Sequence, residues 1–249
     1  MNWGKGADPR DRFGEAKLIS VIVPAYNSEK YLAAALDSIV AQDYRPVEAV
    51  VVDDGSTDAT ASIARSYCDV RYVYQAHQGL PVARNTGLAN CRGALICFLD
   101  ADDYWPPNKL RIQSDYLTAH PELGCVLGKL LNFLEEGMTI PDWISEPLMT
   151  EEGGGWSLGA SLVQRWVFDR VGQFNVLYPY CDDLDWLIRL AEAKIPWEVL
   201  PGVFLHRRIH ASNMSKDRDA VTRAEFRIMK AHMDRKRGKV AEPLPGGHQ

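Results

Sequence analysis

Three carboxylates follow an apolar run near the middle of the chain. Residues 95–99 have the composition of a buried strand, and Asp100, Asp102 and Asp103 come directly after them. These acids should therefore lie where a buried strand meets solvent. Carboxylates this close repel one another, and Mg²⁺ or Mn²⁺ would relieve the repulsion, because both ions prefer oxygen ligands. The alternative is an ordinary strand-to-helix turn, in which Asp103 or a neighbour caps the helix that the following prolines open.

A second pair of acids occupies the same kind of position. Asp53 and Asp54 follow the apolar residues 47–52 and precede Ser56-Thr57-Asp58, a segment with the composition of a helix cap. Ahead of the cap, a carboxylate can accept hydrogen bonds from a base N–H or a ribose hydroxyl. Arg84 is suited to a phosphate or a base, although an exposed arginine on a helix is commonly only solvated. Each of these signals is weak alone.

The elements that must position these residues alternate along the first half of the chain. Apolar runs predict strands at residues 18–23, 47–52, 70–74 and 94–99. Helical spacing predicts helices at 29–41, from the cap at 56–58 to about 67, and at 79–90. Apolar strands alternating with helices indicate an α/β fold with a mostly parallel sheet covered on both faces. Ligands bind beyond the carboxyl ends of such strands, so the polar clusters should meet at one edge.

The second half of the chain is less regular. Helices are expected at residues 108–120, 182–193 and 223–239, and extended segments at 124–133 and 195–205. The stretch 134–155 has no clear periodicity and ends in three glycines and Trp156, which suits either a lid over a binding site or plain disorder. The last helix is basic, and both a solvated face and a contact with a membrane or a partner are compatible with it.

Composition and charge limit the classes of protein open to this chain. The apolar fraction of 46% and charged fraction of 24% are ordinary for a globular domain, and 249 residues can bury a substantial core. With its net charge of −5, the chain lacks the excess of basic residues that is typical of nucleic-acid-binding proteins. The five cysteines form no CxxC pair, which indicates reduced, mainly buried thiols and argues against zinc.

The cellular location is also constrained. Residues 1–17 lack the apolar core of a signal peptide, and no apolar run is long enough to span a bilayer. We therefore expect a cytoplasmic protein without a transmembrane segment. Peripheral contact at the inner face of the membrane stays open, and the oligomeric state cannot be read from the sequence.

In their order along the chain, these motifs resemble those of glycosyltransferase family 2, whose enzymes have the GT-A fold. The matching segments are VIVPAYN at residues 21–27, VVDDGSTD at 51–58, ARNTG at 83–87, FLDADD at 98–103, GQF at 172–174, DDLDW at 182–186 with Arg189-Leu190, and a late His210 followed by Ser212 and Ser215. The resemblance covers about residues 19–215. It implies a Rossmann-like, mostly parallel central sheet flanked by helices.

The resemblance also implies a division of the chain. A GT-A domain at residues 18–215 would consist of a nucleotide-sugar-binding half, 18–105, and an acceptor-binding half, 106–215. A polar N-terminal extension, 1–17, would precede it, and a basic C-terminal helix and tail, 216–249, would follow it.

Roles for individual residues follow from the same resemblance. Asp54 would face the base of a nucleotide-sugar donor, Asp100 would lie near the ribose, and Asp183 would be the catalytic base. Asp102 would bind the divalent cation, Mn²⁺ or Mg²⁺, that bridges the diphosphate. His210 would add a metal or diphosphate contact, although a lone histidine is about as often structural. The full set of implied donor-binding residues is Pro24, Ala25, Tyr26, Asn27, Asp53, Asp54, Arg84, Asp100 and Ala101.

The implied chemistry is an inverting, metal-dependent transfer of a single sugar. A bound metal neutralises the charge that develops on the departing diphosphate, and a positioned carboxylate takes the proton of the attacking hydroxyl. With one base and direct in-line attack, the anomeric configuration inverts. UDP is the commonest donor nucleotide of the family, with GDP and dTDP still open. The acceptor would be a glycan, lipid carrier, peptide or small molecule, as in polysaccharide biosynthesis.

Some positions depart from the family pattern. Asp182 stands where the family pair begins with Glu, and Asn175-Val176 stands where many relatives have Asp-Glu. Gln164-Arg165-Trp166 is contiguous, unlike the Gln-x-x-Arg-Trp of processive synthases, which favours a single addition. Two other functions remain open. A GT-A-like nucleotidyltransferase would carry a Gly-rich phosphate loop where residues 23–30 have none, and a non-catalytic nucleotide-binding scaffold would not need both the metal-binding and the basic carboxylate.

Overall fold

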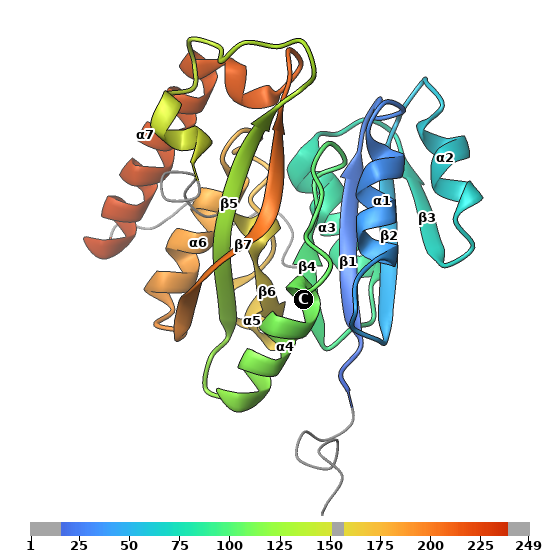
Figure 1. Ribbon diagram of the computed structural model, residues 1–249. Helices are drawn as coiled ribbons and strands as arrows, with labels where there is room; N and C mark the ends of the chain where they lie inside the picture. Colours follow the sequence, from blue (N-terminus) through green and yellow to red (C-terminus); the bar gives the residue numbers. More distant parts are fainter. Residues whose placement is uncertain (1–15, 151–156, 239–249) are drawn as a thin grey trace, which may run out of the picture.

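A seven-stranded sheet organises the part of the chain that the computed structural model describes, residues 16–150 and 157–238. Its strand order is β3-β2-β1-β4-β6-β5-β7 (Figure 1). The strands are β1 (Ile19–Ala25), β2 (Val47–Asp54), β3 (Val70–Gln75), β4 (Leu95–Phe98), β5 (Cys125–Leu134), β6 (Leu162–Gln164) and β7 (Trp197–Ile209). Strands β1 to β4 run parallel, β6 is antiparallel to both of its neighbours, and β5 and β7 are parallel to each other. The predicted mostly parallel α/β sheet is confirmed.

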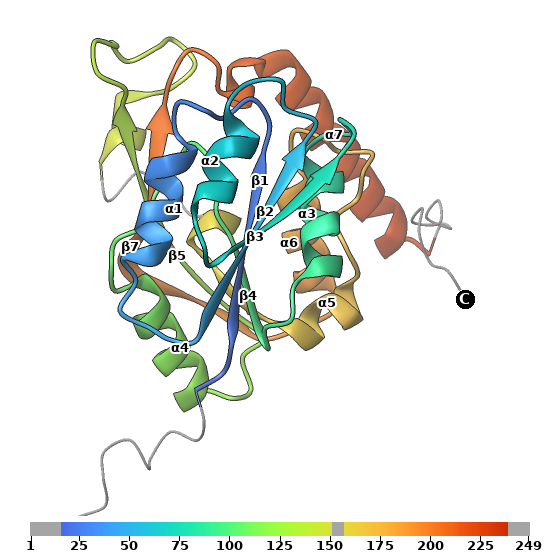
Figure 2. The same cartoon turned by 90° about the vertical axis from the view of Figure 1, so that its right-hand side faces the viewer.

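Helices cover both faces of this sheet, as Figure 2 shows. One face carries α1 (Leu32–Val40), α2 (Thr60–Ser66) and α4 (Lys109–Ala119), and the other carries α3 (Leu80–Asn90), α5 (Arg165–Val171) and α6 (Asp182–Glu192). The last helix, α7 (Arg218–Lys236), packs on the outside of α6. Short 3₁₀ helices lie at Glu146–Met149, Leu158–Ala160 and Met214–Lys216.

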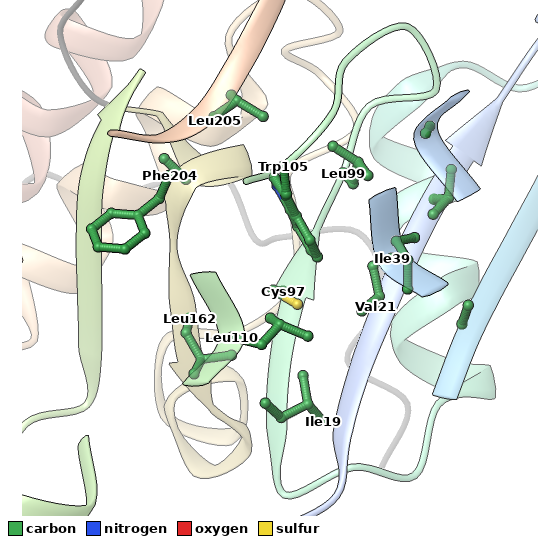
Figure 3. Packing of buried hydrophobic residues seen from close by; sticks show 14 of the residues in the cluster. Ile19, Val21, Ile39, Cys97, Leu99, Trp105, Leu110, Leu162, Phe204 and Leu205 are labelled. Carbon is green, nitrogen blue, oxygen red and sulfur yellow. The ribbon is translucent and has the colours of Figure 1, made fainter. Parts of the chain in front are cut away.

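The core is built by alternation along fully buried strands. In β1, Val21 and Val23 pack toward α1, whereas Ile22 packs toward α3. In β4, Cys97 faces the α1 layer and Phe98 faces the α3 layer. Figure 3 shows the first of these two layers, where Trp105, Leu110 and Leu162 lie beside the β1 and β4 side chains. Two-sided burial explains why these strands are apolar at every position instead of at every second one.

Several element boundaries differ from prediction for local reasons. Strand β2 continues to Asp54, because Asp53 and Asp54 still pair with β3. Asp103 does not cap α4, whose N-cap residue is Asn108. Helix α7 begins at Arg218, five residues earlier than expected, because the Asp217 side chain accepts a hydrogen bond from Ala220 N. Strand β7 runs on to Ile209 along β5, beyond the predicted end at residue 205.

Some expectations fall only partly on the described residues. Residues 1–15, 151–156 and 239–249 lie outside them, so the three glycines at the end of the segment interpreted as either a lid or disorder, and most of the predicted N-terminal extension, are not described. All five cysteines are free, and four of them are buried, as predicted. None of the helices in the described ranges is both long enough and apolar enough to span a bilayer.

Candidate active site

The loops that follow β1 and β2 hold each other in place at the carboxyl edge of the sheet, the upper edge in Figure 1. Asn27 has a φ of 46°, a left-handed conformation that asparagine tolerates better than most residues. Its backbone N–H donates to Ser56 Oγ at 2.9 Å, and its side-chain oxygen accepts from Thr57 N at 2.9 Å. These bonds fix the loop that carries Tyr26, whose side chain is 48% exposed.

Asp53 and Asp54, the predicted base-binding acids, are buried and already hydrogen-bonded. Asp53 accepts bonds from Ser56 N at 2.8 Å and from the Tyr72 hydroxyl at 2.6 Å. Asp54 accepts from Gln78 N and Gly79 N, each at 2.8 Å, just ahead of α3, and from the Gln75 amide at 2.6 Å. Asp53 therefore ties the end of β2 to its own turn and to β3, and Asp54 ties it to the loop that enters α3.

His77 adds an aromatic surface that the sequence analysis did not identify. Its Nδ1 lies 2.9 Å from Asp54 Oδ2, and its ring stacks on Tyr26 with centroids 4.1 Å apart. Gly55, with φ at +79°, lets the chain pass here, because a Cβ at that position would lie 2.8 Å from His77 N. A polar residue directly after β3 was the available signal, since β3 ends at the same edge as β2.

Arg84 is buried between two carboxylates. Its Nη1 donates to Asp182 Oδ2 at 2.8 Å and its Nη2 to Asp100 Oδ1 at 3.0 Å, while its Nε is buried without a partner in the described structure. The rest of the ARNTG motif is structural: the Asn85 side chain bonds the backbone of Phe174, and Gly87 lets α3 approach β1 closely. Arg84 therefore links α3, the end of β4 and the start of α6.

The charges around Arg84 shift the pKa values in opposite ways. Burial acts to lower the pKa of Arg84, but the charges of Asp182 and Asp100 outweigh burial and raise it. Burial, and less strongly the charge of Asp183, raises the pKa of Asp182 to about 6 against the opposing pull of Arg84. Asp182 is therefore mostly ionised at neutral pH and forms a buried ion pair with the guanidinium.

Asp183 lies in the first turn of α6, next to this ion pair. It is only partly buried, and within the described structure its side chain makes one hydrogen bond, from Leu184 N to Oδ1 at 2.8 Å. A negatively charged side chain is favoured in the first turn of a helix. Asp183 is thus a partly accessible carboxylate beside a rigid buried pair, a placement that suits a general base.

Asp102 and His210, the predicted metal-binding residues, are in direct contact. His210 Nε2 lies 2.9 Å from Asp102 Oδ2, and Asn213 Nδ2 lies 3.4 Å from the same oxygen. On the other side of the ring, His210 Nδ1 accepts from Ser212 N at 3.3 Å and lies 2.8 Å from Ser212 Oγ. The Tyr31 ring packs against the imidazole with centroids 4.8 Å apart. The sequence analysis assigned no role to Tyr31 or Asn213, which belong to no recognisable pattern.

Asp103, the third carboxylate of the cluster, has a structural role. Burial, with the charges of Asp102 and Asp100, holds the pKa of Asp103 well above its usual range. Its Oδ1 accepts a bond from Arg208 N at 2.8 Å, and Arg208 Nε donates to Asp102 O at 3.0 Å. Strand β7 is thereby fastened to the turn that presents Asp102.

The donor set at Asp102 and His210 fits a divalent cation. Adjacent ligands of an octahedral ion at about 2.1 Å are about 3 Å apart, close to the 2.9 Å between Asp102 Oδ2 and His210 Nε2. The described residues contain no group of three or more His, Cys, Asp or Glu side chains placed to hold a metal, so an ion here would need further ligands from water or substrate phosphates. Completion of the ligand shell by water and substrate phosphates is typical of Mg²⁺ sites, whose protein ligands are commonly one or two carboxylates.

The predicted site residues thus fall into three groups at one sheet edge. Asp53, Asp54, Tyr26 and Asn27 lie at the ends of β1 and β2; Arg84, Asp100 and Asp183 lie around the buried ion pair; Asp102 and His210 form the third group. Three further predicted residues are buried at this edge, where they can offer a ligand only backbone groups and small apolar side chains: Pro24, Ala25 and Ala101.

Comparisons with known proteins identify the family and the fold of the chain. Residues 20–175 match the model of the family described as glycosyl transferase family 2. WfaP of Escherichia coli, a UDP-Glc:alpha-D-GlcNAc-diphosphoundecaprenol beta-1,3-glucosyltransferase, is 29% identical over 209 residues, which are 81% of this chain and 81% of WfaP. The chain spans between 14% and 35% of the length of several other curated glycosyltransferases that it matches.

Solved structures show the same fold. Staphylococcus aureus TarS 1-349 in complex with UDP-GlcNAc has a TM-score of 0.66 at 21% identity, over 84% of this chain and 65% of that one. The mannosyltransferase PcManGT from Pyrobaculum calidifontis, in complex with GDP-Man and Mn²⁺, has a TM-score of 0.66 at 23% identity, over 98% of this chain and 70% of that one. The fold is GT-A, and the chain belongs to glycosyl transferase family 2, whose members transfer sugars.

Proposed function

We propose that this glycosyltransferase moves a single sugar from a nucleoside diphosphate sugar to an acceptor hydroxyl, with inversion of the anomeric carbon and with the help of a divalent cation. The observation that carries the proposal is the meeting of two unlike groups at one sheet edge. One is the contact between Asp102 and His210, and the other is the accessible carboxylate of Asp183 beside the Arg84–Asp182 ion pair.

The donor nucleotide would bind across the ends of β1 and β2. Tyr26 and His77 offer a stacked pair of rings, and aromatic faces of this kind can pack against a base. We propose UDP as the nucleotide, supported by the UDP-glucose named for WfaP and the UDP-GlcNAc bound to TarS. Because Asp54 is saturated by protein donors, its role would be to hold the loop that contacts the base.

Asp102 and His210 would hold the cation. A cation is supported by the structure of PcManGT, which is a complex with GDP-Man and Mn²⁺. When bound, the ion supplies Lewis-acid neutralisation of the charge on the departing diphosphate. In the structure His210 Nδ1 accepts from Ser212 N, which leaves the ring proton on Nε2, facing Asp102 Oδ2. To bind an ion through Nε2, His210 would have to carry its proton on Nδ1 instead, where Ser212 Oγ at 2.8 Å would be the acceptor.

Asp183 would take the proton of the acceptor hydroxyl. Arg84 holds Asp182 at 2.8 Å and so fixes the first turn of α6, from which Asp183 projects. Asp182, the residue before the proposed base, is one methylene shorter than the Glu of the family pattern. Its direct bond to Arg84 explains why this position would have to carry an acid. Acceptor contacts would come from residues 106–215. A lipid-diphosphate-linked sugar is the first acceptor to test, because WfaP is named for one.

Two measurements test this function. Calorimetric titration with UDP, GDP and dTDP, each with Mn²⁺ and with EDTA, should show metal-dependent binding of UDP. Binding of GDP or dTDP alone would replace the proposed nucleotide, and equal affinity in EDTA would remove the metal from the proposal. NMR of the product of a UDP-sugar reaction should then show the anomeric configuration opposite to that of the donor. A product with the donor's configuration would contradict the single-displacement mechanism.

A further inference from the structure

The outward face of α7 carries an apolar stripe. Phe226, Met229 and Met233 are 73%, 48% and 46% exposed, and their spacing of three and four residues places them on one side of the helix. On the opposite side, Ala224 and Ile228 are buried in a cluster shared with α6. Helix α7 thus packs on the protein through one face and presents three large apolar side chains to solvent through the other.

Basic residues border this stripe. The exposed cations of α7 and its C-cap are Arg218, Arg223, Arg227, Lys230, Lys236 and Arg237. At 100° per residue, Arg223, Arg227 and Lys230 lie along one flank of the stripe. The acids of the helix are Asp219, Glu225 and Asp234, and Asp234 falls on the same flank as Arg223, Arg227 and Lys230. Two further bases, His232 and Arg235, bond to Glu192 of α6. The whole chain carries a net charge of −5, whereas bases outnumber acids in this helix, so its charge is opposite in sign to that of the chain as a whole.

An exposed helix with large apolar side chains on one side and cations beside them has the chemistry of an interfacial helix, whose apolar groups enter the headgroup region while its bases meet anionic lipids. A second copy of the chain is a poorer occupant. In an antiparallel symmetric dimer through the stripe, the flanking Arg223, Arg227 and Lys230 would be brought toward their own copies, and like charges would oppose association.

We propose that α7 docks this glycosyltransferase on an anionic phospholipid surface, with Phe226, Met229 and Met233 inserted and the basic flank against the headgroups. The helix spans about 28 Å at 1.5 Å per residue, and it lies along the outside of the molecule, away from β3 (Figure 1). It follows His210 by only a short 3₁₀ turn at Met214–Lys216, so a docked α7 would hold the catalytic edge in a fixed relation to the lipid surface. This inference does not depend on the identity of the sugar donor.

Vesicle co-sedimentation tests the proposal on the full chain. Phosphatidylcholine vesicles with and without phosphatidylglycerol are mixed with the protein at low and at high salt, and the bound fraction is measured. We expect binding to the anionic vesicles only, weakening as salt screens the charges. In Arg227→Glu/Lys230→Glu the partition coefficient should fall at least about tenfold, since each base near an anionic surface is worth about 1 kcal/mol, or about fivefold. The matched control is Lys17→Glu/Arg170→Glu, which makes the same change of charge at two exposed positions elsewhere and should bind as the wild type.

The apolar stripe is tested separately. Phe226→Ser/Met233→Ser should also lose at least about tenfold in binding, whereas Val40→Ser/Tyr74→Ser, at exposed apolar positions on α1 and β3, should not. Retained calorimetric binding of UDP by each variant shows that the fold and donor site are intact. Equal binding to neutral vesicles, no binding to anionic ones, or unchanged binding by both α7 variants would overturn the proposal. A dimer in light scattering that Phe226→Ser/Met233→Ser dissociates would assign the stripe to a second copy instead.

Discussion

The carboxylates at the end of β2 and those near the end of β4 occupy similar places in the sequence but differ in what remains open to a ligand. Asp54 is 3% exposed, and both of its oxygens accept bonds from the protein. The Asp102 side chain is 30% exposed, and within the described structure only its Oδ2 has hydrogen-bond partners. Asp183 is similarly open, with a single bond to Leu184 N. An acid after a parallel strand thus marks the ligand edge, but its existing bonds decide whether it supports a loop or meets a ligand.

The strongest test of this comparison is Asp183→Asn. The substitution keeps the size of the side chain and removes its basicity, so turnover should fall about 10²–10⁴-fold, the usual contribution of a general base. The dissociation constant for UDP should stay within about twofold, because the amide changes nothing at the nucleotide. Steady-state kinetics and calorimetry measure the two quantities, with the exposed Asp169→Asn as control. Wild-type turnover in Asp183→Asn would remove the base from this position.

Asp54→Asn tests the opposite side of the comparison. An amide nitrogen in place of one oxygen would face Gly79 N–H or Gln78 N–H, donor against donor, in a buried position. The free energy of unfolding should fall by about 1–3 kcal/mol, the cost of leaving a buried polar group unpaired. Urea denaturation measures it, and Asp102→Asn, at the more open acid, should lose less. Unchanged stability together with lost UDP affinity would mean that Asp54 acts on the base itself, and the contrast between the two regions would fail.

Asp102→Ala tests whether the more exposed carboxylate of Asp102 is a ligand of the cation. If Asp102 and His210 hold the cation together, removing one ligand should weaken UDP binding in Mn²⁺ at least about tenfold, while binding in EDTA should not change. Calorimetry with and without EDTA gives both constants on the same preparation. A variant that responds to Mn²⁺ as strongly as the wild type would show that the ion binds elsewhere.

The pH dependence of stability gives the smallest expected effect. Burial raises the pKa of Asp182 to about 6, above the value near 3.9 of an unfolded chain. Between these two values the folded protein holds a proton that the unfolded chain has released, so this group adds stability as pH falls from 6 to 4. The free energy of unfolding of the wild type, relative to Asp182→Asn, should rise by roughly 1 kcal/mol per pH unit over that range. A difference that falls with acidification would mean that Arg84 dominates and the pKa is lowered.

Most of the fold could be predicted because its strands are buried on both sides and therefore apolar throughout. Strand β6 could not, since three residues are too few to show a period, and without it the antiparallel junction of β4 and β5 is hidden. The family resemblance placed Asp102 and His210 together although 108 residues separate them. His77 was missed because it is a single polar residue whose importance comes from its stacking on Tyr26, which depends on the packing of loops.

The buried Arg84 also bears on how independently the parts of this protein can fold or be exchanged. It bonds Asp100, in the segment proposed to bind the donor, and also Asp182, which lies 98 residues after Arg84 in the segment proposed to bind the acceptor. Separated from the donor segment, Asp182 would lose its counter-ion, and Arg84 would keep only Asp100; leaving a buried charge without its partner costs several kcal/mol. Unfolding should therefore be a single cooperative transition. A chimera that takes its acceptor segment from another glycosyltransferase should fold only if that segment has a carboxylate at the position of Asp182. Donor and acceptor segments can therefore be recombined only when this ion pair is kept.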